Sequence, residues 1–208
     1  MRISLTFDDG PNTQTTVHIL DVLEQHKIPA SFFLVGQNIN EKTAGSMRRE
    51  LDDGCSIECH SWTHRAFTDL SPKEMSEEIE KTNEAIEKNC GQKPLFFRPP
   101  YIAVNQSVFD AVKMPMIQGR GVDDWDENVS VESRVKNVVS HAHDGQIILL
   151  HDSDGNEKTA EALKQIIPEL KNMGAEFYNI RDLFKICNVN PNVKNKLWTD
   201  VLDGTSKA

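Results

Sequence analysis

Short apolar runs alternate with longer amphipathic segments along most of the chain. An apolar run bounded by turn residues is typical of a buried strand, whereas apolar positions three and four apart are typical of a helix. Strands are predicted at residues 3–7, 30–35, 55–59, 95–97, 114–118, 146–150 and 176–180. Helices are predicted at residues 13–26, 42–53, 71–89, 104–112, 130–141 and 157–172, with a last short helix that reaches residue 184.

This alternation with short links predicts an α/β fold with a parallel sheet or barrel. About seven parallel strands is one fewer than a complete (β/α) barrel has, so a distorted, incomplete barrel is expected. The pattern fades from Asn188 onward. The main domain is therefore expected to span residues 1–187, followed by a C-terminal tail or linker at 188–208. Within that tail, Trp198 and Leu202 are the side chains expected to pack back on the body.

Composition narrows the function classes. A net charge of −9 argues against a nucleic-acid binder, which needs a basic face. No apolar run reaches membrane-spanning length. The four cysteines lack the paired spacing of a zinc knuckle, and no disulfide framework is predicted. Met1 lies almost on the first strand, so no signal peptide precedes it, although a trimmed start leaves export open.

Two adjacent carboxylates, Asp8 and Asp9, end the first predicted strand, and a Gly-Pro pair follows them. Two like charges this close raise each other's pKa unless a cation lies between them. A bound metal is one such cation: one aspartate would ligate it and the other would stay free for proton transfer. The alternative is that the pair only caps the following helix, for which Asp-Gly-Pro is suited.

His60 and His64 follow the third predicted strand at a spacing of four residues. On a helical turn this spacing puts both rings on one face, where they can hold one metal ion. The zinc-protease pattern would place a glutamate after the first histidine, but Ser61 stands there. The general base must therefore come from elsewhere, and Asp8 is available.

Three further polar residues, Arg98, Asp124 and His151, also lie at or just beyond the ends of predicted strands. In a parallel architecture those ends converge at one edge, so residues far apart in sequence can meet in one cleft.

Five segments in this order resemble the motifs of the polysaccharide deacetylase family, also described as the NodB-homology fold and carbohydrate esterase family 4. They are Thr6-Phe7-Asp8-Asp9-Gly10, His60-Ser61-Trp62-Thr63-His64, Arg98-Pro99-Pro100-Tyr101, Asp124-Trp125 and Leu149-Leu150-His151. The resemblance implies a distorted (β/α) barrel and metal-dependent removal of acetyl groups from glycans.

The resemblance also implies a role for each matching residue. Asp8 is similar to the catalytic base and Arg98 to the arginine that pairs with it. The implied metal ligands are Asp9, His60 and His64.

The remaining matches concern the substrate and the leaving group. Tyr101 resembles the residue whose backbone N–H stabilises the oxyanion, and His151 resembles the general acid, kept protonated by Asp124. Leu149 and Trp125 look like apolar walls around the acetyl methyl group, although without the resemblance both are equally well explained as core residues.

Two positions depart from the family pattern. Ile102 follows the Arg-Pro-Pro-Tyr motif where many members have glycine, and Gly121 stands where many have aspartate. These departures bear on substrate choice. Asp152 and Asp154 are interpreted as turn residues before Gly155, and His141 and His143 as helix-end residues.

The acetylxylan esterase branch is the nearest resemblance, which implies release of acetate from acetylated xylan. The alternatives are an N-deacetylase acting on chitin oligosaccharides or peptidoglycan and a glycan-binding pseudo-enzyme without turnover. One divalent metal ion is expected, and two imidazoles with one carboxylate suit zinc, cobalt, nickel or iron. A secreted monomer, or one module of a multidomain protein, is expected to act on an acetylated polysaccharide or oligosaccharide.

Overall fold

The computed structural model describes residues 1–203. The strands are β1 (Arg2–Asp8), β2 (Ser31–Leu34), β3 (Ser56–Cys59), β4 (Met116–Ile117), β5 (Arg120–Gly121), β6 (Gln146–His151), β7 (Glu176–Phe177) and β8 (Leu197–Trp198). The helices are α1 (Thr15–His26), α2 (Ala44–Asp52), α3 (Pro72–Cys90), α4 (Gln106–Ala111), α5 (Val131–Val139), α6 (Glu157–Asn172) and α7 (Ile180–Ile186). Three short 3-10 helices are η1 (Gly36–Asn38), η2 (Phe67–Asp69) and η3 (Pro100–Ile102).

The strands form an irregular ring. One sheet runs in the order β3-β2-β1-β6-β5, with β7 beside β1, and every ladder between named strands is parallel. Beyond β3 the ring continues through single bridges from Cys59 to Phe97 and from Phe97 to Met116 in β4. Because only two residues separate β4 from β5, the chain itself returns to the sheet. The predicted parallel α/β fold, a distorted barrel, is confirmed.

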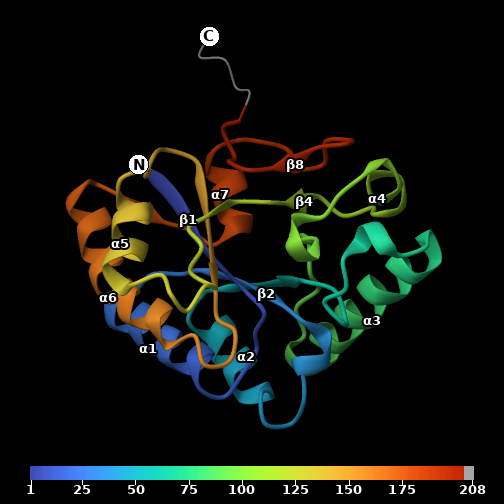
Figure 1. Cartoon of the computed structure of the whole chain (residues 1–208), viewed down its shortest axis with the longest axis horizontal. Coiled ribbons are helices and arrows are strands. Elements are labelled where there is room, and N and C mark those ends of the chain that lie inside the picture. The colour runs from blue at the N-terminus through green and yellow to red at the C-terminus, as the bar shows by residue number, and fades with distance from the viewer. Residues whose placement is uncertain (204–208) are drawn as a thin grey trace.

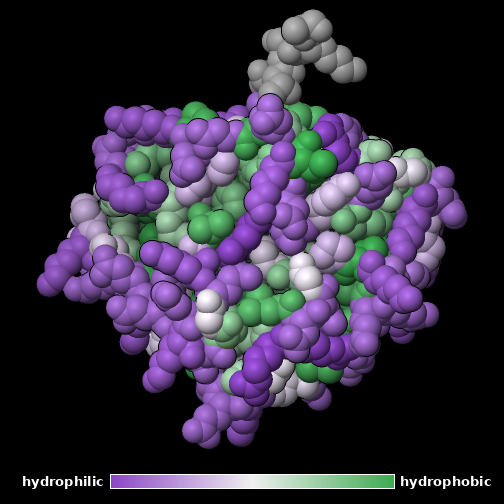
Figure 2. All heavy atoms as spheres, turned by 180° about the vertical axis from the view of Figure 1, so that it is seen from behind, coloured by the Kyte–Doolittle hydropathy of each residue, from purple (hydrophilic) through white to green (hydrophobic). Residues whose placement is uncertain are grey.

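Helices cover the outside of this ring. In Figure 1, α1, α5 and α6 lie on one side of the strands and α3 and α4 on the other. The largest apolar cluster joins the sheet to α1 and α6, and includes Leu5, Leu20 and Leu163, none of them exposed. Figure 2 shows the face seen from behind, where hydrophilic residues dominate and apolar ones form small patches.

The predicted helix beginning at Ser71 is confirmed in detail. The Ser71 hydroxyl accepts from the Glu74 N–H while the Glu74 carboxylate accepts from the Ser71 N–H, a complete capping box. Gly91 ends the helix with a left-handed φ of 72°. The predicted strand at 95–97 is reduced to one bridged residue, Phe97.

Part of the predicted tail, residues 188–208, packs against the main domain. Residues 197–198 form β8, which pairs in parallel with β4, and the Trp198 side chain is only 5% exposed. Val201 is fully buried in the same apolar cluster. The packing of Trp198 on the body is therefore confirmed, and the packed unit extends past residue 187, at least through Val201. Residues 204–208 of the predicted tail lie outside the described residues.

Two expectations from composition can be compared with the structure. All four cysteines are free, as expected. In the part of the chain that the structure describes, no helix has the length and apolar character needed to cross a membrane.

Candidate active site

The carboxyl ends of β1 and β6 bring Asp8 and His151 together. Asp8 is the last residue of β1, and the register of the parallel ladder places it beside His151, the last residue of β6. The residues of β1 from Ile3 to Asp8 are all buried, because strands cover both of its edges. The Asp8 side chain is consequently 3% exposed at the floor of a cleft.

Arg98 is the fully buried partner of Asp8. Its Nη1 donates to Asp8 Oδ1 over 2.5 Å, while Nη2 donates to the Thr6 hydroxyl over 2.9 Å. The guanidinium lies 4.1 Å from the centre of the Phe33 ring. Only one guanidinium nitrogen therefore bonds Asp8, since the second donates to Thr6. The other oxygen of Asp8, Oδ2, lies 3.7 Å from His60 Nε2, and Asp8 lines the cleft.

Burial outweighs the arginine in its effect on Asp8. Loss of solvent raises the pKa of Asp8, and the charges of Arg98 and His151 lower it by less, so the net direction is upward.

Asp124 holds His151 from two directions. Asp124 Oδ1 lies 2.8 Å from His151 Nδ1, and Asp124 Oδ2 accepts the His151 backbone N–H over 2.8 Å. The Thr159 hydroxyl also donates to Oδ2, over 2.7 Å. Burial lowers the pKa of His151. The opposing effects are larger: the hydrogen bond and charge of Asp124, with the charges of Asp8 and Asp9, raise the pKa to about 9. The ring is thus protonated at neutral pH, with Nε2 as its remaining donor.

Asp9, His60 and His64 form a three-residue cluster whose ligand atoms all lie within 4.8 Å of one another. Asp9 Oδ1 is 3.6 Å from His60 Nε2 and 3.3 Å from His64 Nε2, and the two Nε2 atoms are 3.2 Å apart. The His60 Nδ1 lies 2.7 Å from the Arg98 carbonyl oxygen, which requires Nδ1 to carry the proton. Burial lowers the pKa of His60 to about 3, so its Nε2 presents a lone pair to the cluster.

The histidine pair is not on a helix. Ser61 and His64 have left-handed φ angles of 68° and 57°, and the segment from His60 to Arg65 is an irregular loop. The predicted helical turn is therefore wrong, although the loop still brings the two imidazoles together.

A cavity of about 610 Å³ opens over these groups. Tyr101 and Trp125 stand on its wall with 71% and 64% of their surface exposed, while Leu149 is 7% exposed. Trp125 is therefore not a core residue, and Tyr101 packs the edge of its ring against His64 at 4.7 Å between centroids. The complete lining is Asp8, Asp9, His60, His64, Tyr101, Ile102, Gln118, Gly119, Gly121, Asp123, Trp125, Leu149 and His151.

Sequence reasoning missed some members of this wall. Gln118 and Gly119 line the cavity, but no motif signals them. Gly121, which departs from the family pattern, leaves room: a Cβ built there would meet only Leu149, at 3.8 Å. Ile102, the other departure, also lines the cavity.

Asp152 is a buried anchor and not a surface turn residue, which corrects its interpretation. Its carboxylate accepts the Gly10 N–H over 3.0 Å and the Thr16 hydroxyl over 2.5 Å, and the residue is fully buried. Burial, assisted by the charges of Asp9 and Asp8, raises its pKa to about 7. A Cβ at Gly10 would lie 2.2 Å from Asp152 Oδ2, so any larger residue there would have to displace the buried Asp152 carboxylate. Only the fold reveals this contact, because its partners are more than a hundred residues apart.

Comparison with known sequences identifies the family. The sequence model of the family described as Polysaccharide deacetylase matches residues 1–116. The chain belongs to the polysaccharide deacetylase family. A bifunctional xylanase/deacetylase of Pseudobutyrivibrio xylanivorans is 45% identical over 199 residues, covering 96% of this chain and 33% of that protein. The chain thus spans about a third of the length of that relative.

Two solved structures of this family superpose closely. The Xyl-CE4 domain of a multidomain xylanase from the hindgut metagenome of Trinervitermes trinervoides is 46% identical, with a TM-score of 0.94, covering 96% of this chain and 97% of that one. A family 4 acetyl xylan esterase from Clostridium thermocellum in complex with a cobalt ion is 37% identical, with a TM-score of 0.93, covering 97% of this chain and 99% of that one.

Proposed function

We propose that this polysaccharide deacetylase is a metal-dependent carbohydrate esterase that removes O-acetyl groups from acetylated xylan and releases acetate. The observation that carries the proposal is the Asp9, His60 and His64 cluster beside Asp8, whose Oδ2 lies 3.7 Å from His60 Nε2, in one cavity. The relatives named for xylanase, deacetylase and acetyl xylan esterase activity support the choice of substrate.

The three cluster residues fit a divalent cation. Two imidazole nitrogens and one carboxylate oxygen suit zinc, cobalt, nickel or iron, and three protein ligands leave positions open, as in catalytic sites. The His60 ring is already oriented by the Arg98 carbonyl oxygen, which leaves its Nε2 available. When bound, such an ion supplies Lewis acidity that polarises the acetyl carbonyl and acidifies the attacking water.

The chain's own residues supply the proton transfers. Asp8, once ionised, accepts the proton of the attacking water at Oδ2, because Arg98 occupies Oδ1. His151 donates its Nε2 proton to the departing sugar oxygen, since Asp124 holds Nδ1. The Tyr101 backbone N–H stabilises the negative charge on the acetyl oxygen, and Leu149 and Trp125 enclose the acetyl methyl group.

Acetate release from acetylated xylan tests this proposal. Purified protein is stripped of metal, loaded in turn with Zn²⁺, Co²⁺, Ni²⁺ or Fe²⁺, and assayed for acetate. We expect turnover that chelation abolishes and that Asp8→Asn lowers by about 10² to 10⁴-fold, the usual contribution of a general base. Asp154→Asn, on an exposed turn, is the matched control and should be fully active.

Other outcomes would change the assignment. Acetate from chitin oligosaccharides or peptidoglycan, but none from xylan, would identify an N-deacetylase. Binding of glycan without turnover of any substrate would identify a pseudo-enzyme. An alkoxide leaves more easily than an amine anion, so His151→Ala should harm hydrolysis of an ester less than that of an amide.

We also propose a setting for the reaction. A polymeric plant glycan is met outside the cell, so a secreted, monomeric protein or module is expected. The bifunctional xylanase/deacetylase of Pseudobutyrivibrio xylanivorans is about three times as long as its matched region, which supports a place within a multidomain enzyme.

A further inference from the structure

The proposed metal ligands lie on two loops that are far apart in the sequence. Asp9 follows β1, whereas His60 and His64 flank the loop after β3. Neither loop has regular backbone: Asp9, Ser61 and His64 have φ angles of 80°, 68° and 57°. Non-glycine residues adopt such angles only when their surroundings impose them. Besides contacts within the motifs, both loops are held by hydrogen bonds from residues outside the five sequence motifs.

The segment from Val35 to Asn38 touches both loops. On one side, the Val35 N–H donates to the Gly10 carbonyl oxygen over 2.9 Å, and Asn38 Nδ2 donates to the Asp9 carbonyl oxygen over 2.7 Å. On the other side, the Gly36 N–H donates to the Ser61 carbonyl oxygen over 2.9 Å. One short stretch of chain thus fixes the spacing between the two ligand-bearing loops.

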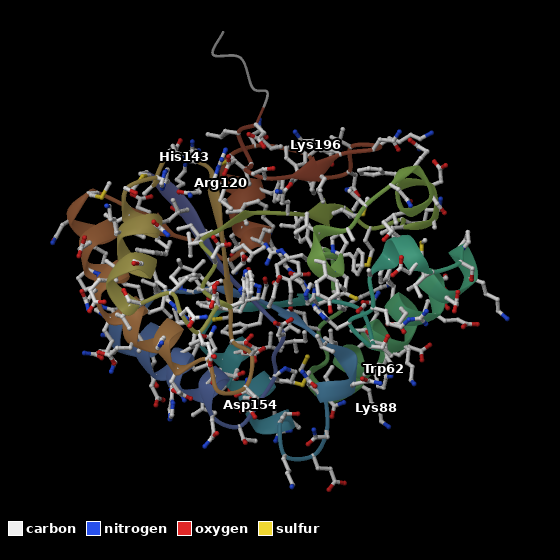
Figure 3. The ribbon with its side chains drawn as sticks, in the orientation of Figure 1. Trp62, Lys88, Arg120, His143, Asp154 and Lys196 are labelled. Carbon is white, nitrogen blue, oxygen red and sulfur yellow. The ribbon has the colours of Figure 1, made fainter. Side chains whose placement is uncertain are left out.

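Glu78 holds the histidine loop from α3. Its Oε2 accepts the backbone N–H groups of Trp62 and Thr63 over 2.8 and 2.7 Å, and its Oε1 accepts the Thr63 hydroxyl over 2.8 Å. Charged acceptors of this kind make the stronger hydrogen bonds. Figure 3 shows Trp62 at the rim of the molecule beside α3, and Lys81 of that helix lies 4.0 Å above its ring.

We propose that Glu78 and Asn38 are positioning residues for the metal site: they act on the backbone of the ligand loops and so set the distances among Asp9, His60 and His64. This inference rests on the metal dependence proposed above. Both residues bind the peptide groups next to the ligands, while the ligand atoms themselves contact one another. Removing the hydrogen bonds of either Glu78 or Asn38 lets a ligand loop relax away from the geometry that one ion requires.

Cobalt affinity measures this role directly. Metal-free wild type, Glu78→Ala and Glu78→Gln are titrated with Co²⁺ against a competing chelator, and the visible absorption of the bound ion is recorded. We expect Glu78→Ala to bind about ten-fold more weakly or worse, with an altered spectrum, as other residues that orient metal ligands do. Glu78→Gln should stay within about three-fold, because its carbonyl oxygen can accept both N–H groups while its amide donates to Thr63.

Glu84→Ala is the matched control, since Glu84 is an exposed carboxylate on the same helix. It should bind Co²⁺ as the wild type does. Asn38→Ala tests the role of Asn38 independently and should also weaken binding, which keeps the inference testable where Glu78→Ala does not fold. Equal affinities and spectra for wild type, Asn38→Ala and the folded Glu78 variants would overturn the inference. Absence of Co²⁺ binding by the wild type would instead overturn the proposed metal dependence.

Discussion

Asp124 determines the protonation state of the residue proposed as the general acid. It is fully buried, and both of its oxygens are used by His151 and Thr159. Burial alone would strip His151 of its proton at neutral pH, because a charged imidazole is poorly solvated in the interior. The nearby carboxylates reverse that effect and raise the pKa of His151 to about 9. The acid therefore works across neutral pH only while Asp124 is charged.

Asp124→Asn should move the alkaline limit of activity. A raised pKa means that His151 keeps its proton through neutral pH and loses it as the pH rises past about 9, where acetate release should fall. Without the hydrogen bond and charge of Asp124, only the charges of Asp8 and Asp9 oppose burial, so the pKa of His151 should fall and the alkaline limit should move to lower pH. The pH dependence of kcat/KM for metal-loaded protein measures this. An alkaline limb left at the wild-type pH would contradict the assignment of His151 as the acid.

At the scale of single residues, the sequence predicts those site residues that lie at the ends of strands. Asp8 and His151 end strands β1 and β6, His60 directly follows β3, and the ends of parallel strands converge. Glu78 and Asp152 could not be found in this way. A glutamate on an amphipathic helix normally faces solvent, and an aspartate before a glycine normally makes a turn. Their roles arise from hydrogen bonds to loops whose path is set by the whole fold.

Among the helices, α2 carries an unusual buried charge site. Glu50 is fully buried, and neither carboxylate oxygen has a hydrogen-bond partner. Burial, with a smaller contribution from the charge of Asp152, holds the pKa of Glu50 well above its ordinary value. An unsatisfied polar group in the interior costs about 1–3 kcal/mol. The helix is consequently less stable against the sheet than its apolar residues would allow.

Glu50→Leu should stabilise the protein by about 1–3 kcal/mol at neutral pH. The pKa of Glu50 is higher in the folded than in the unfolded protein. Its contribution to the free energy of unfolding is therefore fully present below pH 4.5 and is lost as the pH rises through the folded pKa. The gain of the variant should therefore grow from acid to alkaline pH. Urea unfolding at several pH values gives the free energy of unfolding against pH for the wild type and for Glu50→Leu. Parallel curves, or a destabilised variant, would show that Glu50 has partners in solution.

The elements differed in how far their sequence revealed them. The α3 helix has a capping box and a C-terminal glycine, so its bounds follow from local chemistry. The strands β5 and β8 have two residues each, which is too short for any periodic pattern. They exist because neighbouring strands β6 and β4 offer free edges, and only the assembled sheet supplies those.

For the molecule as a whole, the segment after α7 packs on the barrel through β8, which pairs with β4 at the end of the molecule drawn at the top of Figure 1. Trp198 packs its ring edge-on against Phe184 at 5.2 Å, and its Nε1 donates to the Pro191 carbonyl oxygen over 3.0 Å. Asp200, only 3% exposed, pairs with Arg120 on β5. Figure 3 shows Arg120 and His143 side by side at the end of the molecule where this segment returns. The segment thus joins β4, β5 and α7 into one packed unit.

Truncation after Cys187 should therefore destabilise the barrel itself. It removes the buried side chains of Trp198 and Val201, each worth about 1.5–3 kcal/mol of burial, together with the β4–β8 ladder. Trp198→Ala alone should cost about 3–5 kcal/mol, as large-to-small core substitutions do, whereas Val193→Ala, at a residue 49% exposed, should change little. Urea unfolding followed by circular dichroism measures all three proteins against the wild type. A truncated chain as stable as the wild type would mean that residues 188–203 are a dispensable linker.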